Sequence, residues 1–147
     1  RYVGEADRDF FLTYGDAVSD VDVAGLLETH RCSGKCLTVT AVHPSGRFGE
    51  IKLQGRAVTG FHEKPQTTAG YINGGFMVVD KGFVARYLTE DEGLVLEERP
   101  MREVVRDGAM GAFVHEGFWQ CMDTAREYSL LNELWNHGGA PGTQHWK

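Results

Sequence analysis

Two aspartates lie where apolar runs end, and together they could hold a metal ion. Asp16 closes the stretch FFLTYGD, which begins at Phe10, and Asp123 closes the aromatic stretch FWQCMD. An aspartate that follows a glycine or opens a helix is most often a turn former or a helix cap. The sequence therefore leaves two interpretations of this pair, ordinary turn residues or two halves of one metal site.

Two further motifs carry polar groups that could bind a ligand. Glu63-Lys64 precedes a proline, and Asn73 precedes the pair Gly74-Gly75. In an open parallel sheet, ligands bind at the carboxyl ends of the strands, so polar residues in the loops there are the candidates for a site. Taken alone, the first motif is more often a solvated turn and the second a tight turn.

Short apolar segments alternate with amphipathic ones along the chain, which is typical of an α/β fold. Residues 10–14 predict a buried strand, residues 23–30 have helical spacing, and residues 37–42 are rich in β-branched side chains. This order predicts a βαβ unit with two strands in the same direction. Residues 48–53 and 57–62 predict a small antiparallel hairpin over the edge of the sheet.

The same alternation continues after the hairpin. Residues 72–80 begin with the glycine pair and continue as a buried strand, and residues 83–88 have helical spacing. Pro100 opens a short helix, and residues 112–115 predict a further strand. We expect a mixed, mostly parallel sheet with helices on both sides.

The last helix is expected to begin at a capping box formed by Thr124 and Glu127. Apolar residues then recur at helical spacing and predict one apolar face, formed by Tyr128, Leu131, Leu134 and Trp135.

Composition excludes several classes of function. The 147 residues suffice for one domain with a real core and are few for two. The net charge of −6 is opposite to the basic character of nucleic-acid-binding proteins. No apolar stretch approaches the roughly 20 residues of a membrane helix, and these residues do not begin with a basic segment followed by an apolar signal core. We expect a cytoplasmic protein without nucleic-acid or membrane partners.

Three cysteines suit a reducing compartment better than a disulfide framework. Cys32 and Cys36, with His30 nearby, have a spacing that could suggest zinc, but a second ligand pair is missing. The sequence favours plain packing or surface thiols at these positions.

Taken together and in this order, the motifs resemble those of the sugar-1-phosphate nucleotidyltransferases, most closely the glucose-1-phosphate cytidylyltransferases. The matching segments cover nearly the whole chain: FFLTYGDAVSDVD, LTVTAVHPSGRFG, FHEKP, YINGGFMVVD, EERPMREVVRDGAMGAFVHEGFWQCMDT and NELW. The Gly-Asp, Glu-Lys-Pro and Asn-Gly-Gly motifs belong to the family at large, whereas TYGD, GRFG and GFWQCMDT are typical of the cytidylyl branch. The resemblance implies a truncated, Rossmann-like nucleotidyltransferase fold in residues 1–136 and a loose Gly-rich tail in residues 137–147.

The resemblance also implies a reaction and a cofactor. In the intact family, glucose 1-phosphate and CTP give CDP-glucose and pyrophosphate, and negative charge accumulates on phosphate oxygens. Asp16 and Asp123 would hold Mg²⁺, which prefers carboxylate, phosphate and water oxygens. Lys64 would bind the phosphate of the sugar as a point charge and completes the implied catalytic set.

The implied sugar pocket uses side chains and bare backbone. Glu63 would accept hydrogen bonds from sugar hydroxyls, and Gly49 of GRFG would let the sugar ring approach the main chain. The full set implied to bind substrate is Gly49, Glu63, Lys64, Asn73, Gly74 and Gly75.

Two departures from the family qualify the expected function. Ala17 replaces the glycine usual in the cytidylyl branch, and the Gly-rich loop with its Arg and Lys, which binds the triphosphate, is not found before Phe10. The resemblance therefore implies that roughly the first two-fifths of a normal enzyme is absent, and we expect the nucleoside triphosphate to bind only if that segment is supplied. The alternative function is a non-catalytic, self-associating or sugar-phosphate-binding remnant. In either case the apolar strand at 10–14 would form an exposed edge, so we expect a homodimer or higher oligomer.

Overall fold

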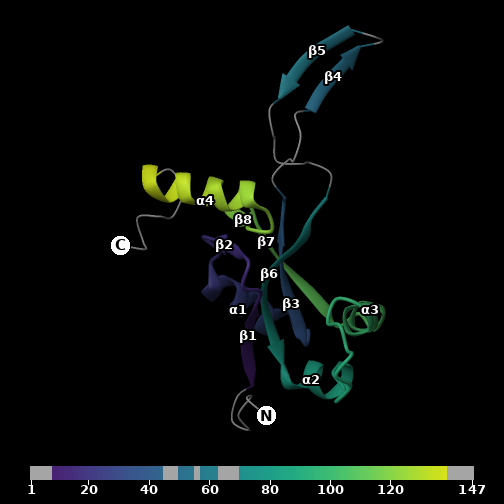
Figure 1. Ribbon diagram of the computed structural model, residues 1–147. Coiled ribbons are helices and arrows are strands. Elements are labelled where there is room, and N and C mark those ends of the chain that lie inside the picture. Colours follow the sequence, from purple (N-terminus) through teal and green to yellow (C-terminus); the bar gives the residue numbers. More distant parts are fainter. Residues whose placement is uncertain (1–7, 45–49, 55–56, 63–69, 139–147) are drawn as a thin grey trace.

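The computed structural model describes residues 8–44, 50–54, 57–62 and 70–138. Its centre is a sheet with the order β1-β6-β3-β7, formed by β1 (Asp9–Thr13), β6 (Ile72–Asp80), β3 (Leu37–Val42) and β7 (Met110–His115) (Figure 1). β6 is antiparallel to both of its neighbours, and β3 is parallel to β7. Thus β1, β3 and β7 share one direction, and the expected mixed sheet is confirmed, but two of its three strand pairings are antiparallel because β6 lies between β1 and β3. The predicted βαβ unit forms with β6 inserted between its two strands.

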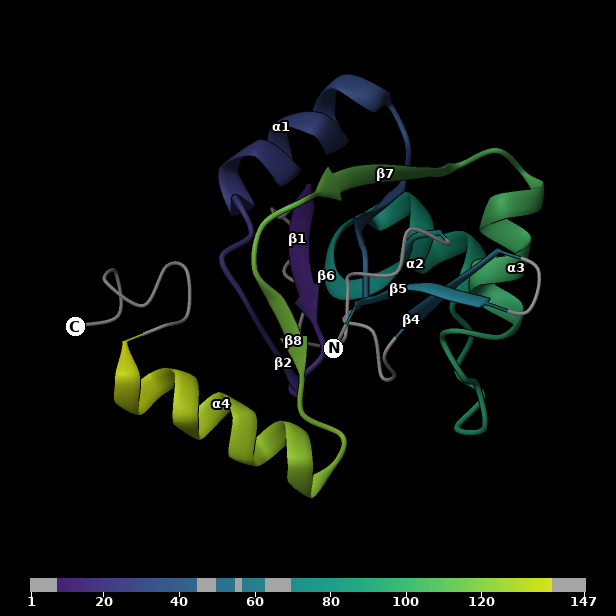
Figure 2. The same ribbon diagram turned by 90° about the horizontal axis from the view of Figure 1, so that it is seen from above.

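Helices cover both faces of this sheet (Figure 2). On one face lies α1 (Val23–Ser33), which buries Leu26 and His30. On the other lie α2 (Lys81–Tyr87) and α3 (Arg99–Arg106), and their side chains join the core cluster of Leu37, Met77, Val79, Phe83, Tyr87 and Val104. Each large apolar side chain removed from water there contributes about 1.5–3 kcal/mol.

Local capping determines where the helices begin and end. The Asp22 carboxylate accepts hydrogen bonds from two backbone N–H groups of the first turn of α1, and Gly34 ends that helix with a φ of 63°. Pro100 lies in the first turn of α3, as predicted. The capping box predicted at Thr124 and Glu127 is confirmed and opens α4 (Ala125–His137). Among the described residues, no helix combines the length and apolar character needed to cross a membrane.

A two-stranded sheet that the sequence does not predict lies beside the main one. β2 (Ala17–Ser19) pairs antiparallel with β8 (Trp119–Cys121), with Ala17 opposite Cys121 and Ser19 opposite Trp119. Each strand has three residues, too few for apolar and polar side chains to show an alternating pattern.

The predicted hairpin is confirmed as β4 (Glu50–Gln54) paired with β5 (Ala57–His62). It extends away from the sheet instead of lying over its edge (Figure 1). Alternating side chains predict that two strands pair with each other, but they do not say where the pair packs.

Two apolar surfaces are left uncovered by the described residues. β1 is an edge strand, and Phe11 on it is 53% exposed. α4 buries none of its residues: Tyr128 and Trp135 of the predicted apolar face are 58% and 56% exposed. The α4 helix is thus specified by its cap and its sequence more than by packing.

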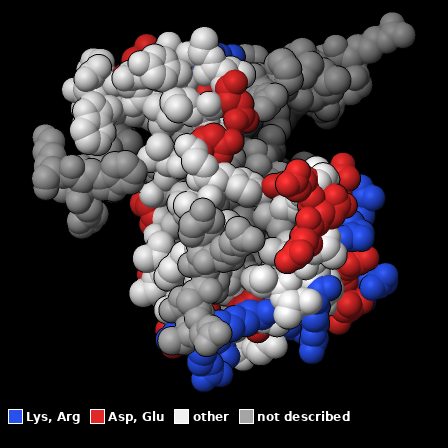
Figure 3. Space-filling model, turned by 60° about the horizontal axis from the view of Figure 1, so that its bottom comes forward, with Lys and Arg blue, Asp and Glu red and all other residues white. Residues whose placement is uncertain are grey.

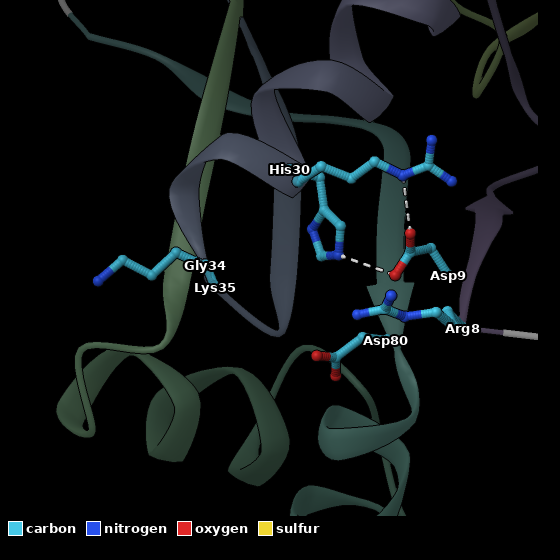
Figure 4. A pocket seen from close by; sticks show the side chains of 7 residues that line it. Arg8, Asp9, His30, Gly34, Lys35 and Asp80 are labelled. Carbon is cyan, nitrogen blue, oxygen red and sulfur yellow. Dashed lines mark hydrogen bonds and ion pairs between the residues drawn. The ribbon is translucent and has the colours of Figure 1, made fainter.

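A polar cavity of about 370 Å³ lies where β1 begins and β6 ends, lined by Arg8, Asp9, His30, Arg31, Gly34, Lys35 and Asp80 (Figure 4). Acidic and basic side chains are interspersed over this end of the molecule (Figure 3).

His30, which lines this cavity, is only 3% exposed. Its Nδ1 lies 2.9 Å from Thr38 Oγ1 and its Nε2 lies 3.8 Å from Asp9 Oδ1. Burial lowers the pKa of His30, and the carboxylates of Asp9 and Asp80 oppose this only in part.

We expect the free energy of unfolding to fall as the pH drops below 6.5, the ordinary pKa of histidine. His30 takes up a proton near that pH in the unfolded chain but only at lower pH in the folded one. The stability it contributes is therefore complete above pH 6.5 and is lost below it. Urea unfolding between about pH 5 and 7.5 measures the slope.

His30→Asn keeps a polar group near the position of Nδ1 but does not titrate, so it should flatten this slope. The matched control is His137→Asn at the exposed end of α4, which should leave the acid-induced loss in place. A slope unchanged in His30→Asn would contradict the assignment to His30.

Candidate functional site

A second cavity, of about 260 Å³, lies at the opposite end of the sheet, where β1 ends and β6 begins. β1 and β3 run in the same direction, so their carboxyl ends meet here, as at ligand sites of α/β sheets. Four distant segments line it: Tyr14, Asp16 and Ala17; Pro44; Ile72, Asn73 and Gly74; and Trp119, Gln120, Cys121, Asp123 and Glu127.

Asp16 and Asp123 come together on this cavity. The pairing of β2 with β8 places Met122 against Asp16, whose carbonyl oxygen accepts a hydrogen bond from Met122 N at 2.8 Å. Both aspartates are exposed and both line the cavity. Two acids far apart in the sequence thus line one cavity. Among the described residues, the side chains close enough together to share a metal ion are those of Cys121, Asp123 and Glu127, a group that does not include Asp16.

Polar contacts hold β2 against β8. His115 Nε2 lies 3.0 Å from Asp20 Oδ1, and Ser19 Oγ donates to Phe118 O at 2.8 Å. Gly117 fits only because it lacks a side chain, since a Cβ there would lie 2.6 Å from Asp20 Oδ1. Ser19 lies 3.3 Å from the same nitrogen of His115, whereas a catalytic relay needs serine and aspartate on opposite ring nitrogens. We interpret Ser19, Asp20 and His115 as a structural hydrogen-bonding group that holds β2 near β8.

Glu127 and Cys121 extend the group around Asp123. Glu127 Oε2 accepts hydrogen bonds from Asp123 N and Thr124 N, both at 2.9 Å, and from Thr124 Oγ1 at 3.0 Å. Burial, the largest single influence, raises the pKa of Glu127, but these bonds together bring it below its ordinary value. The carboxylate is therefore ionised and held in place.

The side-chain atoms around Asp123 that could bind a metal ion suit a hard cation. The ligand atoms of Cys121, Asp123 and Glu127 all lie within 4.8 Å of one another. Burial, followed by the two carboxylates, raises the pKa of the Cys121 thiol, so the thiol is protonated at neutral pH. The groups on offer are therefore carboxylate oxygens, the ligands that Mg²⁺ prefers. The capping box located Glu127 in the sequence, but nothing in the sequence placed it on this cavity.

The backbone of Gly74 and Gly75 is fixed between aromatic residues. Trp119 Nε1 donates to Gly74 O at 2.8 Å, and Tyr14 N donates to Gly75 O at 2.9 Å. Gly75 has a φ of 79°, which disfavours other residues, and a Cβ there would lie 2.9 Å from Tyr14 Cδ2. Both the backbone conformation and the neighbouring Tyr14 ring therefore favour glycine at position 75.

Comparison with known proteins shows which proteins this chain resembles. A scan of protein-family models found no match. The glucose-1-phosphate cytidylyltransferases of Salmonella typhi and Salmonella typhimurium are 39% and 38% identical to this chain, each over 141 residues and 96% of the chain. The chain is thus similar, over nearly its whole length, to sugar-1-phosphate nucleotidyltransferases. It spans about half the length of these relatives, since the match covers 52% of each.

The fold agrees with membership of the nucleotidyltransferases. A Bacillus anthracis structure, described as a glucose-1-phosphate thymidylyltransferase in complex with a sucrose, superposes with a TM-score of 0.61. The match covers 88% of this chain and 55% of that one at 17% identity, so it supports the fold alone.

The structure describes only some of the residues that the nucleotidyltransferase resemblance implicates. Asp16, Asp123, Asn73 and Gly74 line one cavity, and Gly75 adjoins it through a hydrogen bond from its N–H to Asn73 Oδ1 at 3.0 Å. Gly49, Glu63 and Lys64 lie outside the described residues.

The alternative zinc site near Cys32 gains no support from the structure. Cys32 is exposed, Cys36 is buried in the core, and His30 contacts Thr38. Within the described ranges, the side chains grouped closely enough to hold a metal are those of Cys121, Asp123 and Glu127.

We expect Gly75→Ala to destabilise the protein more than Gly34→Ala. Both glycines have positive φ, so each alanine incurs roughly 1–2 kcal/mol of backbone strain. Only at Gly75 does the added Cβ also meet a neighbour, because Gly34 has nothing within 4 Å. Urea unfolding of the two variants measures the difference, and equal losses would show that Tyr14 does not confine the glycine pair.

Proposed function

We propose that this chain carries the sugar-phosphate and magnesium half of a nucleotidyltransferase site, of the kind that makes CDP-glucose and pyrophosphate from glucose 1-phosphate and CTP. The observation that supports this most is the meeting of Asp16 and Asp123 on one cavity beside Asn73 and Gly74. The match to glucose-1-phosphate cytidylyltransferases supports the substrate class.

The proposed reaction is a displacement at phosphorus. A phosphate oxygen of glucose 1-phosphate attacks the α-phosphorus of CTP, and the bond from that phosphorus to the oxygen bridging to the β-phosphate breaks, which releases pyrophosphate. Mg²⁺ bound by Asp16 and Asp123 would neutralise charge on the phosphate oxygens. No side-chain nucleophile is needed, so these residues act by binding and orienting the two phosphates.

At the sugar end of the site, the proposal assigns charge and hydrogen bonds to separate residues. Lys64 binds the sugar's phosphate and Glu63 accepts from its hydroxyls, while Gly49 admits the ring close to the backbone. Asn73 and the Gly74-Gly75 backbone form the wall of the pocket. The bonds from Trp119 and Tyr14 to the glycine carbonyls support this assignment, because they hold the wall still.

We propose that the 147 residues bind the sugar phosphate but do not catalyse the reaction unaided. The family resemblance assigns triphosphate binding to a Gly-rich loop followed by Arg and Lys, a pattern that this sequence does not contain. Each donor to a transferring phosphate typically contributes about 10²-fold or more in rate. Activity would then require that these groups be supplied by a segment outside these 147 residues.

Asp16→Asn and Asp123→Asn should each weaken Mg²⁺ binding by about tenfold or more, because each removes a charged ligand while keeping its shape. Mg²⁺ should also strengthen binding of glucose 1-phosphate to the unsubstituted chain. Isothermal titration measures both effects. The matched control is Glu28→Gln, at an exposed position on α1, which should bind like the unsubstituted chain. Unchanged Mg²⁺ affinity in both aspartate variants would rule out the metal site.

The second candidate function is a non-catalytic, self-associating module. The exposed Phe11 on edge strand β1 and the uncovered face of α4 favour it, because an apolar edge strand is a template for pairing with another copy.

Two measurements separate catalyst from module. We expect a dimer or larger oligomer by light scattering at micromolar concentration, and Phe11→Lys should shift the oligomer towards monomer by placing charge on the edge strand.

We also expect no pyrophosphate release from CTP and glucose 1-phosphate above background. A stable monomer would contradict self-association, and pyrophosphate release that Asp16→Asn abolishes would contradict the inactivity of the isolated chain.

A further inference from the structure

A chain of hydrogen bonds runs from the surface to the proposed sugar pocket. The Tyr14 hydroxyl donates to Glu97 Oε1, and Asn73 Nδ2 donates to the Tyr14 hydroxyl oxygen at 3.5 Å, at the long end for a hydrogen bond. Asn73 Oδ1 in turn accepts from Gly75 N at 3.0 Å. Glu97 lies just before α3, on a different segment from the residues that line the cavity.

The directions of the two hydrogen bonds of the Tyr14 hydroxyl follow from Glu97. An ionised carboxylate can only accept hydrogen bonds, so Tyr14 must donate its one proton to it. The Tyr14 oxygen can then only accept from Asn73, which turns the amide nitrogen towards Tyr14. The amide oxygen faces Gly75 N, whose hydrogen bond favours the same orientation.

This arrangement leaves one group of Asn73 available to a ligand. The side-chain amide has two N–H donors, and one of them is directed at Tyr14. Among the described residues the other has no partner, and Asn73 lines the cavity. A sugar hydroxyl or phosphate oxygen in the cavity would therefore meet a donor whose orientation is already fixed.

We propose that Glu97 is a positioning residue for the sugar-phosphate site, which acts through Tyr14 to fix the orientation of the Asn73 amide. The inference rests on the proposed function for its ligand, glucose 1-phosphate. Without an ionised acceptor at position 97, the Tyr14 hydroxyl no longer has to accept from Asn73, and the amide is held only by the hydrogen bond that Gly75 N donates to its oxygen.

The environment of Tyr14 agrees with a phenol that keeps its proton. Burial first, and the hydrogen bond to Glu97 second, hold the pKa of Tyr14 well above its usual value. Tyr14 therefore remains a donor to Glu97 throughout the physiological pH range.

The most informative variant is Glu97→Gln, because glutamine keeps the shape but can donate as well as accept. If Glu97 only filled space, this change would be silent. We expect it to weaken glucose 1-phosphate binding by about tenfold, the effect of losing one well-placed hydrogen bond. Mg²⁺ affinity should stay unchanged, because Asp16 and Asp123 do not share this network. Isothermal titration of the full chain measures both.

Two further variants complete the test. Tyr14→Phe should lose about as much affinity as Glu97→Gln, and the double variant should lose no more than either alone, since both break one chain. Glu98→Gln is the matched control, because Glu98 is exposed and its side chain makes no capping hydrogen bond. In ligand-free samples, NMR signals of the Asn73 side-chain amide should move in Glu97→Gln and Tyr14→Phe and stay in place in Glu98→Gln.

The outcomes distinguish this inference from the function on which it rests. Glucose 1-phosphate binding that is equal in Glu97→Gln and the unsubstituted chain, or additive losses in the double variant, would overturn the role of Glu97 and leave the proposed function standing. Failure of the unsubstituted chain to bind glucose 1-phosphate would overturn the proposed function, and the positioning role with it.

Discussion

The short antiparallel pairing of β2 with β8 is the constraint on which the rest of the site depends. It contains only three residue pairs, yet it brings Asp16 beside Met122 and so places Asp123 on the same cavity. A ladder this short gains little from its own hydrogen bonds. Its position is secured from outside, by the contact of His115 with Asp20 and by the bond from Trp119 to Gly74.

Most groups of the proposed site are held in place by hydrogen bonds that involve neighbouring backbone atoms. Glu127 is fixed by the N-terminus of its own helix, the glycine pair by Tyr14 and Trp119, and Asn73 by Gly75. Asp16 and Asp123 themselves stay exposed at the cavity wall, where a cation and phosphate could reach their carboxylates. The packed sheet thus positions the proposed metal-binding aspartates while their carboxylates stay in contact with solvent. This avoids the high free-energy cost of desolvating a carboxylate.

The sequence predicts those features that rest on local rules. Thr124 with Glu127 forms the expected capping box, Pro100 lies in the first turn of its helix, and the alternating elements give the expected sheet. What it could not predict depends on contacts between distant segments. β2 and β8 are too short for a pattern, and the bond between Tyr14 and Glu97 joins segments with no shared motif. The family resemblance nominated Asp16 and Asp123, but their proximity is visible only in three dimensions.

The convergence of Asp16 and Asp123 on one cation is tested most directly by paramagnetic broadening in NMR spectra with Mn²⁺, an oxygen-preferring ion like Mg²⁺. We predict that the backbone signals of Gly15 and Asp16 broaden at the same low Mn²⁺ concentration as those of Met122 and Asp123, and that excess Mg²⁺ restores both sets together. Broadening of one segment without the other, or at clearly different Mn²⁺ concentrations, would contradict a shared site.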